Sequence, residues 1–309
     1  MPRHLYIQNA SKISFENNSI VVQRTKDDNG LSFPLEDLDL VFLEDYKTYI
    51  TSALLAEMGN RGVSLVVCGK DFLPAAQSSP VNGHYLQSAI MKLQLEQLPY
   101  KKKKYWEFVV KQKIANQIAV LQATNDDNEA ITRLQNYQEQ VRPGDETNME
   151  GIAARVYFSS LFGKDFIRFS QSPLSSALNY GYSILASCVI RQVSVSGLVD
   201  NIGVWHNAAA NANNLSYDLI EPFRQMVDYY VYCHQKEVTL PLNKNLKLGL
   251  ISLLNEQIKI SGLECKTAYA VELMVEAYVN YLKTGKTESI KLPAYQPGLA
   301  VETEEEQNG

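Results

Sequence analysis

The spacing of hydrophobic residues changes along this chain. Over the first 67 residues, short runs alternate between apolar and polar side chains, which is the pattern of strands with one buried face. These runs cover residues 4–7, 12–15, 20–22, 31–35, 39–43 and 63–67. A short helix is predicted at 51–59, with Thr51 or Ser52 as its N-cap. We therefore expect a small strand-rich domain over residues 1–75.

The pattern becomes helical after a linker. Residues 76–84 contain Pro80, Asn82 and Gly83, which favour turns. Beyond them, apolar residues recur at three- and four-residue steps, the period of a helix with one buried face. The predicted helices cover residues 85–98, 103–122, 129–141, 149–162, 178–196, 216–231, 245–255 and 265–284. The expected fold class is α+β, with a larger all-α domain at 85–290 following the strand-rich one.

The chain ends in an acidic segment. Pro293, Pro297 and Gly298 precede a run with four glutamates, so we expect residues 291–309 to form a disordered tail. The formal net charge is −5, and these glutamates account for four of the negative charges. Without these four glutamates the chain is near neutral. A near-neutral protein can still bind phosphates through a basic face, because such contacts depend on local clusters of positive charge. Deleting residues 293–309 should then leave catalysis intact.

Composition is that of an ordinary globular protein. Of the 309 residues, 45% are apolar and 20% are charged. No apolar run reaches transmembrane length, no secretory signal opens the chain, and the four cysteines lack a C-x-x-C pair. We expect reduced thiols in a cytoplasmic protein without contact to a membrane. The sequence has neither a Walker loop nor a dinucleotide fingerprint.

The stretch 203–228 holds the most informative polar residues. His206 lies in a loop-like run, and a helix is predicted just after it. Residues three or four apart on a helix are neighbours, so Asp218 and Glu221 can share one site. The same spacing continues to Gln225 and Asp228, and the alternative is an ordinary helix with a solvated acidic face. Pro222 should bend this helix, because proline has no N–H to donate to the preceding turn.

Glu150 allows two interpretations. Residues 147–150 fit the capping-box pattern, in which Thr147 caps the helix and Glu150 bonds back to the cap. The other interpretation is a metal ligand. A basic run precedes Tyr105 and Trp106 and could contact phosphates without reading sequence, or form a solvated helix start. This run consists of Lys101, Lys102, Lys103 and Lys104.

Four segments resemble the ordered motifs of a known family. They are EGIAARVYFSSLFG at 150–163, SALNYGYSILASCV at 176–189, SGLVDNIGVWHN at 196–207 and SYDLIEPFRQMVD at 216–228. These motifs are similar to those of the CRISPR-associated integrase and endonuclease family, which inserts new spacers, and most of all to its type II branch. The resemblance extends to about residue 291, and the acidic tail is an addition to the family pattern.

The resemblance implies a site and a reaction. The family's metal, Mg²⁺ or Mn²⁺, would be held by Glu150, His206 and Glu221, with Asp218 behind these ligands. Arg155, Arg168 and Arg224 lie within or beside the motifs and are candidates for DNA contact. The implied reaction is a transesterification in which prespacer 3′ ends are joined to repeat borders. Two other functions use the same residues: a metal-dependent nuclease of DNA repair, and a non-catalytic DNA-binding scaffold.

The resemblance also implies partners. These are double-stranded DNA (prespacer and repeat), a second copy of this chain, and a small companion adaptation protein. The companion is a ferredoxin-like dimer that would complete a heterohexamer, and the type II effector nuclease is a further implied partner. The β-rich domain would be sandwich-like and form the homodimer, while the helical domain would be catalytic.

The implied homodimer can be tested on the purified protein. We expect the purified protein to be a homodimer at micromolar concentration, through its N-terminal domain, because the resemblance implies that interface. Light scattering after size exclusion measures the mass directly. A monomeric mass under these conditions would contradict the expectation.

Overall fold

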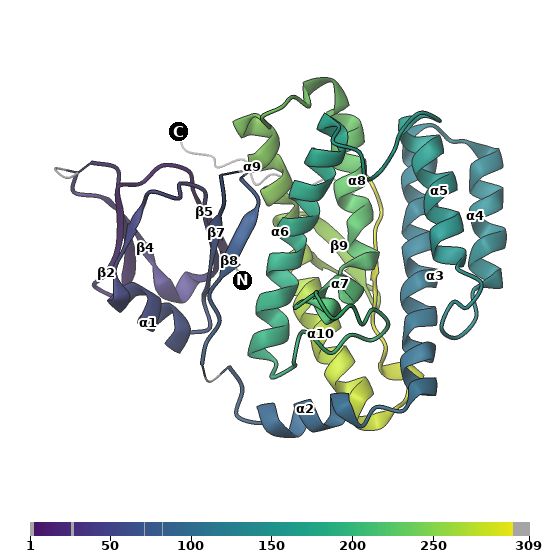
Figure 1. Ribbon diagram of the computed structural model, residues 1–309, viewed down its shortest axis with the longest axis horizontal. Coiled ribbons are helices and arrows are strands. Elements are labelled where there is room, and N and C mark those ends of the chain that lie inside the picture. The colour runs from purple at the N-terminus through teal and green to yellow at the C-terminus, as the bar shows by residue number, and fades with distance from the viewer. Residues whose placement is uncertain (1–2, 26–27, 71, 82, 299–309) are drawn as a thin grey trace. The chain divides into compact units, whose positions relative to one another are not determined.

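The N-terminal strands form two four-stranded sheets in a computed structural model, which describes residues 3–25, 28–70, 72–81 and 83–298 (Figure 1). The first sheet has the order β1 (Arg3–Ile7), β5 (Leu38–Leu43), β7 (Ser64–Cys68), β8 (Pro74–Gln77). The second has the order β4 (Leu31–Pro34), β3 (Ser19–Gln23), β2 (Lys12–Glu16), β6 (Tyr49–Ile50). In the first sheet β1, β5 and β7 are parallel, and β8 pairs antiparallel with β7.

One hydrophobic core joins these two sheets. Ile13 and Ile20 of the second sheet and Val41 of the first are completely buried in it. Helix α1 (Ser52–Asn60) adds Leu54 and Met58 to the same cluster. Its N-cap is Thr51, whose side chain accepts the Leu54 N–H, as the sequence predicted. A short 3-10 turn, η1 (Leu35–Asp37), links β4 to β5.

Helices dominate the rest of the chain, which confirms the α+β class. The α-helices are α2 (Gln87–Leu95), α3 (Pro99–Thr124), α4 (Asn128–Gln140), α5 (Met149–Phe162), α6 (Pro173–Val195), α7 (Asn214–Leu219), α8 (Arg224–Cys233), α9 (Lys244–Ser252) and α10 (Thr267–Thr284). The 3-10 turns are η2 (Glu221–Phe223), η3 (Gln235–Glu237), η4 (Leu253–Asn255) and η5 (Thr287–Ser289). The helix predicted over 216–231 is interrupted at η2, where Pro222 has no N–H to donate.

The helical part also contains a small sheet that periodicity did not predict. Its order is β10 (Leu263–Lys266), β9 (Gln257–Ile260), β11 (Pro293–Ala294). Ser261 and Gly262 connect β9 to β10, and both have positive φ, at 51° and 82°. Two such residues in succession form the tight turn that suits a hairpin. The all-α description of residues 85–290 is corrected accordingly.

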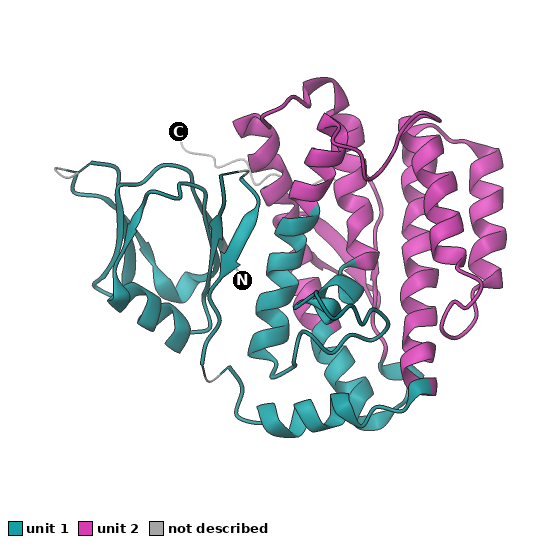
Figure 2. Cartoon of the chain, in the orientation of Figure 1, with its two compact units in different colours: residues 1–99, 182–220, 275–289 teal, residues 100–181, 221–274, 290–309 magenta. Residues whose placement is uncertain are grey.

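The chain divides into two compact units (Figure 2). Unit 1 comprises residues 1–99, 182–220 and 275–289, and unit 2 comprises 100–181, 221–274 and 290–309. The division falls within α6 and α10, so the units do not follow the order of the chain as the predicted domains do. Strand β8 occupies the start of the segment expected to be a linker, and Asn82 of that segment lies outside the described residues.

Residues just after position 291 belong to unit 2 rather than to a free tail. Strand β11 pairs with β9, and the Tyr295 side chain is only 2% exposed. The Tyr295 N–H donates to Asn116 Oδ1 at 3.0 Å, and Asn116 Nδ2 donates to the Pro293 carbonyl at 3.1 Å. These bonds correct the expected start of the tail. The glutamates at 302–306 lie outside the described residues.

All four cysteines are described, and none of them forms a disulfide. In the described part of the chain, no helix combines the length and the apolar character needed to cross a membrane.

Two C-terminal deletions should therefore behave differently. Removing residues 299–309 keeps β11 and Tyr295 and is the reference deletion. Removing 293–309 should destabilise the protein by roughly 3 kcal/mol or more, the cost of losing one large buried aromatic side chain. Thermal unfolding followed by circular dichroism compares the two with the full chain. Equal midpoints for both deletions would show that β11 and Tyr295 contribute nothing.

Candidate active site

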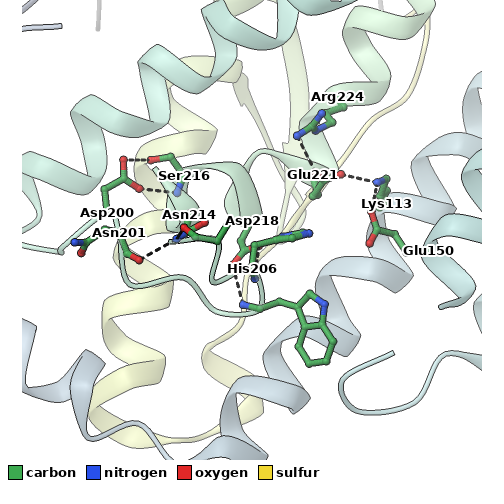
Figure 3. Close-up of polar contacts among 12 residues, drawn as sticks. Lys113, Glu150, Asp200, Asn201, His206, Asn214, Ser216, Asp218, Glu221 and Arg224 are labelled. Atoms are coloured by element: carbon green, nitrogen blue, oxygen red, sulfur yellow. Dashed lines mark hydrogen bonds and ion pairs between the residues drawn. The ribbon is translucent and has the colours of Figure 1, made fainter. Parts of the chain in front are cut away.

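Lys113 stands between two glutamates in unit 2 (Figure 3). Its Nζ atom lies 2.5 Å from Glu150 Oε1 and 2.5 Å from Glu221 Oε2. Arg224 approaches the other oxygen of Glu221, with Nη2 at 2.9 Å from Oε1. Helix α3 carries the lysine, the first turn of α5 carries Glu150, and η2 begins with Glu221. Each oxygen of Glu221 therefore contacts a different cation.

This cluster is buried and its formal charges balance. Glu221 is 5% exposed and Lys113 is 9% exposed, so neither charge has much contact with water. Burial alone would lower the pKa of Lys113, but the carboxylates of Glu221 and Glu150 outweigh it and raise that pKa above its ordinary value. The ammonium therefore stays protonated. Two carboxylates face two cations, which is the arrangement that makes buried charge tolerable.

Asp145 and Asn148 position Glu150. The Asp145 carboxylate accepts the backbone N–H groups of Met149 and Glu150, each at 2.9 Å. The side chain of Asn148, the N-cap residue, accepts the Gly151 N–H. The capping-box alternative for Thr147 and Glu150 is therefore wrong. Since other side chains satisfy the start of α5, the Glu150 carboxylate contacts Lys113 instead.

Helix α3 also fixes the turn that carries Glu221. Asn116 lies one turn after Lys113, and its Nδ2 donates to the Pro222 carbonyl at 2.6 Å. Asn116 is 2% exposed, so this bond forms away from water. One helix thus supplies both the cation between the glutamates and an anchor for the η2 backbone.

In unit 1, the loop before α7 wraps around Asp218. The Asp218 side chain is fully buried, and its Oδ1 lies 2.5 Å from His206 Nδ1. Its Oδ2 accepts the Trp205 N–H at 2.8 Å. Burial raises the pKa of Asp218, and the bonds from His206 and Trp205 oppose that rise. With Nδ1 donating to the carboxylate, the lone pair of the neutral imidazole lies on Nε2.

Asp200 holds the start of α7. Its carboxylate accepts the Ser216 N–H at 2.7 Å, the Ser216 hydroxyl at 2.8 Å and Asn213 Nδ2 at 2.7 Å. Asn213, the N-cap residue of α7, makes no cap bond from its own side chain. The Asp200 carboxylate accepts a helix N–H group in its place, from a position outside the helix. Burial raises the pKa of Asp200. The same contacts fix the start of the helix that presents Asp218.

The acidic stripe is not a solvated face. Its members are Asp218, Glu221, Gln225 and Asp228, and each of them is at most 5% exposed. Because α7 ends before η2 begins, Asp218 and Glu221 are not neighbours on one continuous helix. Asp218 instead contacts the His206 loop, and Glu221 contacts Lys113 and Arg224. Among the described residues, no group of three or more His, Cys, Asp and Glu side chains is placed to hold a metal ion.

The predicted DNA-contacting residues have varied surroundings. Lys103 pairs with Glu146 at 2.7 Å, and Lys104 pairs with Glu107 at 2.9 Å. Lys101 and Lys102 are half-buried, and Arg155 is exposed on α5. Arg168 lies 5.5 Å from the ring centroid of Phe169. DNA contact by these residues stays a prediction.

Sequence reasoning did not assign Lys113 to the site, although its position carried a signal. On helix α3 the residues three and four positions away include Val109, Val110 and Gln117, which are all buried. A lysine within such a stripe requires a buried partner, because an unpaired buried charge is costly. The pattern could have revealed the lysine, but not which carboxylates it meets.

The family of this chain follows from comparison with known sequences. Residues 5–241 match the family described as CRISPR associated protein Cas1. The chain is 34% identical to the CRISPR-associated endonuclease Cas1 of Neisseria meningitidis serogroup C (strain 8013), over 96% of this chain and 97% of that protein. A second relative, from Francisella tularensis subsp. novicida (strain U112), is 29% identical over 70% of this chain and 73% of its own length. This chain belongs to the Cas1 family, which confirms the resemblance.

Solved structures share the fold at low identity. A casposase bound to an integration product has a TM-score of 0.74 and 18% identity, over 98% of this chain and 95% of that one. A Cas1 protein from Thermotoga maritima has a TM-score of 0.71 and 15% identity, over 91% and 97% of the two chains. A chain of a Cas6-RT-Cas1–Cas2 complex has a TM-score of 0.73 and 16% identity, over 96% of this chain and 36% of that one.

Gly203 generates a prediction about the His206 loop. An added Cβ there would overlap the His206 carbonyl oxygen and lie 2.9 Å from Asp218 Oδ2. Gly203→Ala should therefore break the contact between the His206 ring and Asp218, at about 1–3 kcal/mol of stability, the usual cost of overpacking. Histidine ¹⁵N NMR reports the ring contact and thermal unfolding reports the stability. Gly59→Ala is the control, because nothing lies within 4 Å of a Cβ there. An unchanged His206 resonance would refute the assignment.

Proposed function

We propose that this protein is a metal-dependent DNA endonuclease and integrase of CRISPR adaptation. One observation carries the proposal: Glu150 and Glu221, far apart in sequence, converge at 2.5 Å on a single cationic centre, Lys113 Nζ. Paired carboxylates that can hold a cation are the usual core of sites for Mg²⁺ or Mn²⁺. The names of the curated relatives, CRISPR-associated endonucleases, agree with this activity.

By chemical type, two carboxylates and one imidazole would suit such an ion. Glu150 and Glu221 would supply oxygen ligands, and His206 would supply Nε2, whose lone pair follows from the contact of Nδ1 with Asp218. A carboxylate behind a metal-binding imidazole fixes its tautomer and orientation, which is the role we assign to Asp218. Asp218 and Glu221 are three residues apart, so their Cα atoms can be at most about 11 Å from each other. The imidazole favours Mn²⁺ over Mg²⁺.

The proposed reaction assigns separate roles to the ion, to Arg224 and to the DNA hydroxyl. When bound, the ion would orient a DNA 3′ hydroxyl, favour its deprotonation and neutralise charge on the attacked phosphate. Arg224, held by Glu221, would add positive charge for that phosphate. No nucleophilic side chain is required, because the DNA hydroxyl attacks directly. With water in its place, the same residues would cut DNA without joining it.

We extend the proposal to substrates and partners. The DNA would be a double-stranded prespacer and a repeat, and the casposase neighbour was captured with an integration product. The companion would be a small adaptation protein, since another neighbour is part of a Cas1–Cas2 complex. A homodimer of this chain with that companion would form the heterohexamer, and the type II effector nuclease would assist it. Cytoplasmic localisation belongs to the same proposal.

Substitution of the ligands tests the site. Glu150→Ala, His206→Ala and Glu221→Ala should each lower strand transfer roughly thousands-fold, because losing one ligand removes several kcal/mol of transition-state stabilisation. Asp218→Asn should be milder, at roughly 10–100-fold, as for a group behind the ligands. The assay is integration of a short duplex into a supercoiled plasmid carrying a repeat, with and without the companion. Joined and merely cut strands are counted separately.

Matched measurements make this test decisive. Glu129→Ala, an exposed glutamate at the start of α4, should keep full activity. Circular dichroism should show that all the variants are folded. Strand transfer near the level of the unmodified protein in any ligand variant would remove that residue from the site. An Asp218→Asn variant as inactive as the alanine variants would make Asp218 a ligand. Cut but never joined DNA would favour a nuclease of repair.

A further inference from the structure

The ammonium of Lys113 occupies the space between the two glutamates. It contacts one oxygen of Glu150 and one of Glu221, at 2.5 Å each. The lysine side chain is 11% exposed, and the two carboxylates are 21% and 7% exposed. The contact is therefore shielded from water, unlike surface ion pairs, which contribute little. A buried ammonium held by two carboxylates is a strong interaction that any other cation must replace.

A protonated lysine cannot become a metal ligand. Its ammonium has three donors and no lone pair. A divalent ion that takes the same two oxygens therefore meets a second positive charge in contact with its ligands. The repulsion between them is large in a buried site. Either the ammonium leaves, or the ion binds with a severe penalty.

Without any cation, the glutamates would also be unfavourable neighbours. Two carboxylates that share one site repel each other. Lys113 relieves this repulsion, and Arg224 at 2.9 Å compensates the second oxygen of Glu221. Lys113 belongs to the long helix α3, whose backbone holds the base of this side chain beside the glutamates.

We propose that Lys113 is a built-in counter-cation that competes with the metal for Glu150 and Glu221, so that metal binding displaces its ammonium. This inference rests on the proposed function, since it assumes that these two glutamates hold the ion. The lysine holds the two carboxylates together through its contacts with both. It also weakens the apparent affinity for the metal, because each ion bound must break two buried ion pairs.

The test is a metal titration of the purified full-length protein. Free Mn²⁺ is measured by electron paramagnetic resonance for the unmodified protein and for Lys113→Met, which keeps most of the length of the side chain but removes the charge. The Kd for Mn²⁺ should fall by roughly ten-fold or more, the scale expected for removing one unit charge at close range. Lys113→Arg keeps the charge and should retain weak binding.

Lys111→Met is the matched control. Lys111 lies on the same helix and pairs with Glu107 at 2.7 Å. Each of the two substitutions removes one positive charge, so the change in net charge is identical. Its Kd for Mn²⁺ should match that of the unmodified protein. Thermal unfolding adds a second readout. Lys113→Met should be destabilised without metal, and saturating Mn²⁺ should remove most of that loss, because a ligand stabilises the state that binds it.

A measurement on the unmodified protein covers the case in which Lys113→Met does not fold. In ¹³C-lysine NMR, the ε-methylene resonance of Lys113, assigned through Lys113→Arg, should shift when Mg²⁺ saturates the protein. The Lys111 resonance should stay in place. A Lys113 resonance that is unchanged at saturation would overturn displacement.

The outcomes separate this inference from the proposed function. If the unmodified protein does not bind Mn²⁺, or if its Mn²⁺ binding is unaffected by both Glu150→Gln and Glu221→Gln, the proposed metal site is wrong. If it binds Mn²⁺ through these glutamates but Lys113→Met leaves the Kd unchanged, the site stands and the competition by Lys113 is refuted. A tighter Kd in Lys113→Met alone supports the inference.

Discussion

The buried carboxylate of Glu221 links several elements of unit 2. A charge at 5% exposure is tolerated only when cations and hydrogen bonds replace the lost water. Lys113 and Arg224 provide the cations, and Asn116 holds the Pro222 carbonyl next to it. Helix α3, turn η2 and the start of α8 must therefore keep their positions together. Glu150 joins the same arrangement through the lysine.

Acidic residues outside the candidate site hold its parts in place. Asp145 accepts the first N–H groups of α5, which carries Glu150, and Asp200 does the same at the start of α7, which carries Asp218. Neither helix start depends on a side chain that the chemistry would need. Because helix termini leave several N–H groups without an internal partner, these caps fix the direction of the first turn. The functional carboxylates are then available for cations and for His206.

Under the proposed function, the charges of this cluster would suit both a metal ion and a polyanion. With Lys113 and Arg224 facing Glu150 and Glu221, the formal charges cancel in the absence of any ligand. Binding of a divalent ion would leave an excess of positive charge, which the phosphates of DNA would neutralise. A net charge of −5 for the whole chain is compatible with this, because short-range fields follow local groups.

Local pattern by itself determined much of this protein. Helix α5 has the predicted bounds, Thr51 caps α1, and the ordered motifs identified the family, since period, capping and motif are local properties. Tertiary structure decided which distant groups meet. Lys113 and Glu150 are 37 residues apart, and Asn116 binds a carbonyl 177 residues away at Pro293, in a segment whose prolines had suggested a tail. Such pairs depend on how helices pack, because a buried charge or amide is satisfied by whichever partner the fold brings to it.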